Sequence, residues 1–101
     1  MSVGIEVYTI TDTYTGQKVF MGFDVEYRLK TGETVTDASM VITKLGSNAP
    51  IAGMLGTVDI AGSTIESLVH GGIPGHTYIL ILTANTSLGR TLIDKGSFTV
   101  K

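Results

Sequence analysis

The sequence predicts an all-β fold, a sandwich of about seven or eight short strands. Apolar residues, many of them β-branched, alternate with polar ones over short stretches, as in strands that bury one face. The 13 glycines and two prolines separate these stretches so often that few windows could hold a helix of three turns. A chain of 101 residues is long enough for one such domain with its own core.

The first half of the chain contains three stretches with strand-like alternation, over residues 3–10, 18–29 and 34–45. The first is either an N-terminal edge strand or an arm that adds to a neighbouring subunit's sheet. The second is the most regular, because one face is apolar and the other is charged. The apolar face comprises Phe23, Val25, Tyr27 and Leu29, and the charged face comprises Asp24, Glu26 and Arg28.

The second half continues the pattern with shorter elements. Residues 51–56 are apolar but interrupted by glycine, so they form either a short strand covering the core or an exposed contact loop. A short strand is expected over 57–60. Residues 63–69 fit a capped helix as well as a strand, and we expect a strand because the helix would have barely two turns. Residues 77–86 and 91–100 should form a hairpin.

Three residues around the start of this hairpin indicate the type of sandwich. Tyr78 follows a Pro74-Gly75 turn at the head of a strand. Immunoglobulin-like sandwiches place a corner tyrosine there, and its hydroxyl bonds to the upstream backbone. The expected fold is therefore an immunoglobulin/fibronectin III-like β-sandwich, with Gly75 and Gly89 providing positive φ in the turns.

The composition excludes several classes of function. Only 16% of the residues are charged, against about 25% in an ordinary soluble domain, so Thr, Ser and Gly or a partner must cover the surface. A net charge of −2 provides no basic surface for a nucleic acid. The absence of cysteine excludes disulfides and thiolate metal sites. The longest apolar run, Ile79–Leu82, is too short to span a membrane.

A search for catalytic groups gives little. His70 and His76 flank a glycine-rich turn, with no nucleophile elbow and no zinc-ligand spacing around them. Asp24 and Glu26 share a strand face with Arg28, which indicates a solvated charged stripe rather than an acid pair. We therefore expect no catalytic residue, no metal and no cofactor. An enzyme with a histidine base is the weakest alternative.

Four residues are candidate contacts for a protein partner. Ile51, Met54 and Leu55 belong to the apolar segment that could be an exposed loop. Arg90 follows a turn glycine, and it is either a strand-end cation paired with an acid or an anchor at an interface, where arginine is enriched.

Short motifs across residues 22–100 resemble a family of small structural proteins of tailed-bacteriophage virions. The matching pieces are Gly22-Phe23-Asp24, Leu29 with residues 31–35, Gly71-Gly72 with Gly75, Thr77 and Tyr78, and Thr86-Ser87 with Gly89-Arg90. The part from Pro74 to Arg90 is also similar to fibronectin type III domains. The family usually has tryptophans near Val25 and Met40, where this chain has none. Residues 1–21 lie outside the resemblance, which divides the chain into an arm over 1–21 and a sandwich domain over 22–101.

The resemblance implies a non-enzymatic virion protein that is made in the host cytoplasm and then attached to the particle. The main expectation is a capsid decoration or cement protein on the capsid surface, bound to the major capsid protein, with a homotrimer as the natural assembly at three-fold positions. The alternative is a tail- or fibre-attached module that binds host-surface carbohydrate. In that case Tyr8, Tyr14 and His76 are the candidate contacts.

Overall fold

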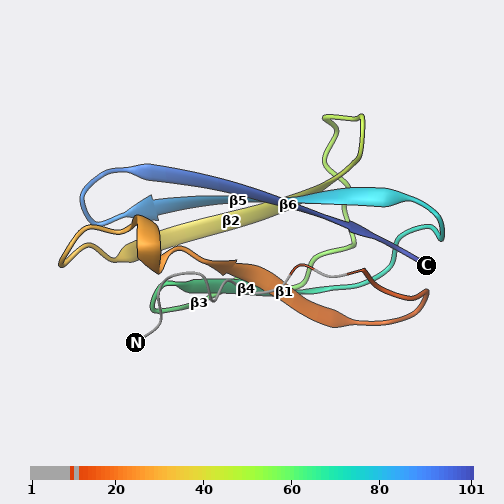
Figure 1. Cartoon of the computed structure of the whole chain (residues 1–101), viewed down its shortest axis with the longest axis horizontal. Helices are drawn as coiled ribbons and strands as arrows, with labels where there is room; N and C mark the ends of the chain where they lie inside the picture. The colour runs from red at the N-terminus through yellow and green to blue at the C-terminus, as the bar shows by residue number, and fades with distance from the viewer. Residues whose placement is uncertain (1–9, 11) are drawn as a thin grey trace.

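The computed structural model describes Ile10 and residues 12–101. Within this part the chain forms six strands in two antiparallel three-stranded sheets, in the orders β1-β4-β3 and β2-β5-β6. Figure 1 shows the two sheets as stacked layers, with their strands along the long axis of the molecule. The elements are β1 Val19–Asp24, the 3-10 helix η1 Glu26–Arg28, β2 Val35–Lys44, β3 Asp59–Ala61, β4 Thr64–Val69, β5 Thr77–Thr86 and β6 Thr91–Thr99.

The second sheet confirms the predicted hairpin. The central strand β5 alternates strictly between half-buried and buried residues over most of its length, because one face lies on the core. Its core-facing residues include Leu80 and Leu82, which lie opposite Ile42 and Met40 of β2. The β5–β6 turn has Gly89 at φ 78°, as its predicted role requires.

The first sheet confirms that residues 63–69 are extended rather than helical. Strand β4 is central and directs Ile65, Ser67 and Val69 into the core. The Ser67 hydroxyl is buried and donates a 3.1 Å hydrogen bond to the Gly56 carbonyl, so this polar group is satisfied. Side chains from both sheets form one continuous core.

The predicted strand over 18–29 is wrong beyond Asp24. The Asp24 carboxylate accepts hydrogen bonds from the Glu26 backbone N–H at 3.0 Å and from the Ser63 hydroxyl at 2.9 Å. This local turn offers the backbone an alternative to the sheet, and the chain enters η1. The alternating pattern breaks as a result, and Tyr27 is exposed although it was expected on the buried face with Val25.

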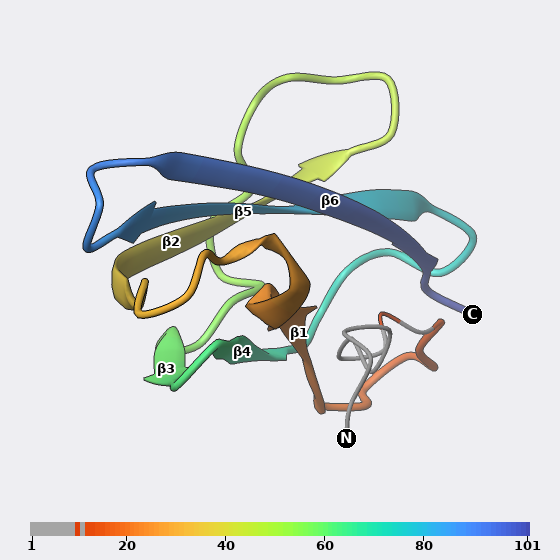
Figure 2. The same cartoon turned by 60° about the vertical axis from the view of Figure 1, so that its left-hand side comes forward.

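Residues 51–56 form an irregular segment rather than a strand. The described part has six strands instead of the seven or eight expected, both because of this segment and because the strand predicted over 3–10 is not covered. The first part of the connection after β2 projects away from the sheets before the chain returns to the core (Figure 2). Single bridges at Pro50 and Leu55 hold it against β2 and β4. The predicted strand over 3–10 lies outside the described residues, except for Ile10.

A short parallel pairing joins two parts of the chain that are far apart in sequence. Thr13 donates to the Thr99 carbonyl at 3.0 Å, Lys101 donates to the Thr13 carbonyl at 2.7 Å, and Thr15 donates to the Lys101 carbonyl at 2.9 Å. The chain then enters β1 at Val19, and the Met21 side chain is fully buried. The first sheet thus begins within the segment expected to be an arm.

Candidate partner-binding site

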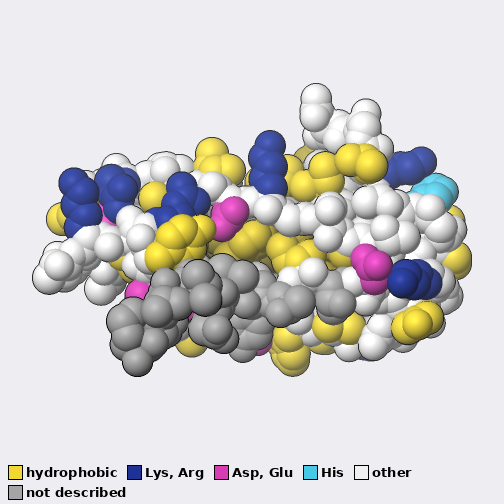
Figure 3. Space-filling model, in the orientation of Figure 1, with side chains coloured by type: hydrophobic (Ala, Val, Ile, Leu, Met, Phe, Trp, Pro, Cys, Tyr) yellow, Lys and Arg dark blue, Asp and Glu magenta, His cyan; other side chains and the backbone are white. Residues whose placement is uncertain are grey.

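The described part of the chain is elongated, with extents of 42 × 29 × 22 Å, and its strands follow the long direction (Figure 1). Two groups of loops therefore lie at opposite ends. The Glu33 end contains residues 25–34, 62–63 and 87–90, and the His76 end contains residues 45–56 and 70–76. Outside the grey residues, the face drawn in Figure 3 is largely white and yellow, and several Lys and Arg side chains gather toward the Glu33 end.

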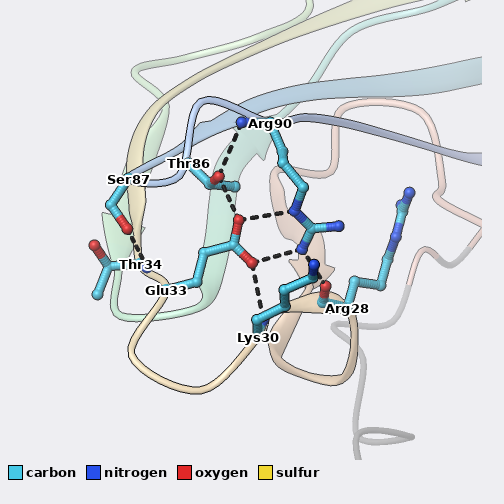
Figure 4. A network of polar contacts seen from close by, with 7 residues as sticks. All are labelled: Arg28, Lys30, Glu33, Thr34, Thr86, Ser87 and Arg90. Atoms are coloured by element: carbon cyan, nitrogen blue, oxygen red, sulfur yellow. Dashed lines mark hydrogen bonds and ion pairs between the residues drawn. The ribbon is translucent and has the colours of Figure 1, made fainter.

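Glu33 is the centre of a polar network at its end of the molecule (Figure 4). Its carboxylate accepts hydrogen bonds from Arg90 Nε at 2.9 Å, from Arg90 Nη2, from the Thr86 hydroxyl and from the Lys30 backbone N–H at 2.8 Å. Arg90 Nη2 also donates to the Arg28 carbonyl at 2.7 Å. The Arg90 and Thr86 hydrogen bonds lower the pKa of Glu33 to about 2.

Arg90 is consequently a strand-end cation paired with an acid, which was one of its two predicted roles. Its guanidinium is committed to Glu33 and to the Arg28 backbone, although 37% of the side chain stays exposed. A second link lies beside it, because Ser87 N–H donates to the Thr34 carbonyl at 2.8 Å and Thr34 N–H donates to the Ser87 hydroxyl at 3.0 Å. These contacts fix the loops of the Glu33 end to one another.

The His76 end contains a hollow of about 440 Å³. Its walls are mainly apolar, and Met54 and Tyr78 in its lining are almost completely buried. Ile73 also lines it and is 57% exposed. Glycines 53, 71 and 72 contribute backbone without side chains, and all three have positive φ. The hollow is open enough and apolar enough to receive a side chain from another molecule.

The Tyr78 hydroxyl fixes one wall of this hollow. It accepts a 2.8 Å hydrogen bond from the Ile73 backbone N–H, which confirms the predicted bond to the upstream backbone. Gly75, at φ 86°, donates its N–H to the Val100 carbonyl at 2.7 Å and so attaches the same turn to the end of β6. The position of Ile73 is thus set by hydrogen bonds on both sides of the turn.

Two basic side chains line the hollow, Lys44 and His76. His76 Nδ1 is buried and has no hydrogen-bond partner within the described residues.

No hydrogen bond joins the ring of His70 or His76 to a serine or carboxylate in the part of the chain that the structure describes. The same part contains no group of three side chains that could hold a metal ion and no helix long and apolar enough to cross a membrane.

The structure separates the four predicted contact residues. Met54 is 4% exposed and belongs to the core, which corrects its candidacy as an exposed contact and supports the core-covering alternative for this residue. Ile51 and Leu55 are half-buried against the same core. Arg90 lies at the other end of the molecule.

Lys44 and Ile73 line the hollow but were not among the predicted contact residues. An isoleucine in a glycine-rich turn was the available signal for Ile73, because a turn gives an apolar side chain little to pack against.

Of the predicted carbohydrate contacts, Tyr8 lies outside the described residues and Tyr14 is 67% exposed. Tyr14 and His76 were predicted to contact the same carbohydrate, but the rings of these two residues do not pair among the residues described.

Comparison with protein families gives a match over most of the chain. The model of a family described as "Podophage GP4 fiber-tail adaptor protein gp77" matches residues 15–101. The chain belongs to this family. No curated protein matches it at a significant level. Membership of the adaptor family confirms the resemblance to phage virion structural proteins, and it favours the tail- or fibre-attached alternative over capsid decoration.

Proposed function

We propose that this protein is a non-enzymatic adaptor that joins a fibre protein to the tail of a podophage virion. The observation that carries the proposal is the family match over residues 15–101, since the family description names an adaptor between fibre and tail. The partners are then tail and fibre proteins of the same particle, and the location is the tail rather than the capsid surface.

The architecture suits a connecting role. An adaptor needs two separate binding surfaces on a body that does not deform when one of them is occupied. The two loop groups lie at opposite ends of a continuous core, and the Glu33 network fixes one of them. The low charge of the chain also suits surfaces that are covered by partners, because interface cores are depleted of charged residues.

We interpret the sandwich as immunoglobulin-like. The hydrogen bond between the Tyr78 hydroxyl and the Ile73 backbone supports this interpretation, because it matches the corner tyrosine of that fold. Such domains direct their loops to the two ends of the sandwich, where a connecting protein needs its contacts.

The direct test is to assemble virions from a phage whose gene for this protein carries an early stop codon. We expect complete heads and tails without attached fibres by electron microscopy, and restored fibres when the protein is supplied from a plasmid. Mass spectrometry of separated heads and tails from the wild-type phage should find the protein with the tails. Fibres that remain on the mutant particles, or a protein that separates with the heads, would contradict the proposal.

A further inference from the structure

We propose that the hollow at the His76 end binds a segment of the fibre protein that presents an apolar side chain next to a carboxylate. This inference rests on the proposed adaptor function and assigns one of its two binding surfaces. The hollow measures about 440 Å³, which suits one or two side chains of an inserted segment rather than a broad flat contact.

The apolar part of the site is already ordered. Met54 and Tyr78 belong to the core, and a hydrogen bond between the Tyr78 hydroxyl and the Ile73 backbone N–H holds the exposed wall. A Cβ built on Gly53 would meet no atom within 4 Å, so this part of the lining is open. A partner side chain can therefore enter without displacing the core.

The polar part of the site selects the charge of the partner. Lys44 and His76 are the basic residues of the lining, and no aspartate or glutamate lines the hollow. The whole chain has a net charge of −2, so this basic character is local. Lys44 is exposed, so its ammonium group is the charge of the lining that a partner can reach from solvent. A carboxylate complements this group.

The fibre is the partner that fits this geometry. A fibre is joined to a tail at one of its ends, and an end segment of a thin fibre can insert into a small hollow. The residues that line the hollow belong to the loops over 45–56 and 70–76 and to the adjoining ends of β2 and β5, at the opposite end of these strands from the Glu33 network. The tail protein then binds elsewhere on the molecule.

The test measures binding of the full-length protein to the purified fibre protein and, separately, to the purified tail protein. Ile73→Asp places a negative charge in the hollow, and Ile93→Asp makes the same change on β6 at nearly equal exposure, 57% against 54%. We expect Ile73→Asp to weaken fibre binding at least tenfold and to leave tail binding within twofold of wild type. Ile93→Asp should change neither fibre binding nor the thermal midpoint.

Lys44→Glu provides a second, independent variant, because Lys44 is exposed and outside the core. It should weaken fibre binding, and added salt should weaken wild-type binding more than binding of this variant. Unchanged fibre binding by Ile73→Asp and Lys44→Glu, or loss of tail binding alone, would overturn the assignment of the hollow while leaving the adaptor function intact. A wild-type protein that binds neither partner would overturn the adaptor function and this inference with it.

Discussion

The carboxylate of Glu33 and the guanidinium of Arg90 form a two-pronged ion pair that connects the loop before β2 to the turn before β6. Both oxygens of Glu33 are occupied, since one also accepts from the Thr86 hydroxyl and the other from the Lys30 backbone N–H. Two charged groups of a weakly charged chain are thereby used to hold loops together.

The first prediction concerns pH. The folded state lowers the pKa of Glu33 from 4.5 to about 2, chiefly through Arg90 and Thr86. Its contribution to stability is therefore complete above about pH 5 and is lost as the pH falls from about 4.5 towards about 2. We expect the difference in thermal midpoint between wild type and Glu33→Gln to be greatest near neutral pH and to shrink across this range. A difference that stays constant in acid would contradict this role.

The second prediction concerns the coupling of the pair. Glu33→Gln and Arg90→Gln should each lower the thermal midpoint at neutral pH, because each leaves a charged partner behind. The double variant should be more stable than the sum of the two losses predicts, since both changes remove the same ion pair. Denaturant unfolding of all four proteins measures this coupling, and simple additivity would exclude a direct interaction. Fibre binding should not change.

The third prediction concerns the corner tyrosine. Tyr78→Phe keeps the ring in the core but leaves the Ile73 N–H without its 2.8 Å partner, which should cost about 1 to 3 kcal/mol of folding free energy. Tyr27→Phe is the matched control, because Tyr27 is 55% exposed and should change stability little. Equal effects of the two substitutions in urea unfolding would argue against the hydrogen bond.

The fourth prediction concerns the lack of space for a side chain at Gly22 between β1 and β4. A Cβ on Gly22 would lie 2.0 Å from the Ile65 carbonyl oxygen, so Gly22→Ala must separate β1 from β4. We expect a loss of about 3 kcal/mol or more, the upper end of the usual overpacking penalty. Gly56→Ala serves as the control, since its Cβ would meet Leu68 at an ordinary 3.5 Å. Similar urea midpoints for the two variants would contradict the packing described.

The fifth prediction follows from the correction at Met54. Because Met54 is 4% exposed, Met54→Ala should destabilise the fold by about 2 to 5 kcal/mol. Leu55→Ala should cost less, because Leu55 is only half-buried. Thermal unfolding of the two variants distinguishes a core residue from a surface contact, and an unaffected midpoint for Met54→Ala would restore the exposed-loop interpretation.

Strand patterns were predictable where one face of a sheet is buried along its whole length. Strands β4 and β5 have that property, and their alternation survives in the structure. In β6 the alternation also survives, although only Leu92 and Phe98 of its inward positions are buried. The strand after Lys18 was predicted too long, because the alternation continues beyond Asp24, whereas the Asp24 carboxylate accepts a hydrogen bond from the Glu26 backbone N–H in a local turn. A hydrogen bond made by one side chain leaves no periodic signal in the sequence.

The candidate site was less predictable than the fold. The family resemblance indicated a virion protein, and Tyr78 indicated the corner, but neither shows how the loops pack. The segment over 51–56 is apolar whether it covers the core or binds a partner, and only the tertiary structure separates buried Met54 from half-exposed Ile51. Lys44 and Ile73 are distant in sequence and share a hollow only after β2 and β5 have paired.

The parallel pairing of residues 13–15 with 99–101 has a mechanical consequence for a protein that connects two bodies. When residues 13–15 and 99–101 are drawn apart in opposite directions along the chain, the three backbone hydrogen bonds between the two segments are loaded in shear. All three bonds then resist together, whereas a hairpin pulled open from its ends loses its bonds one after another. The domain should therefore bear tension along the direction of its strands better than its small size suggests.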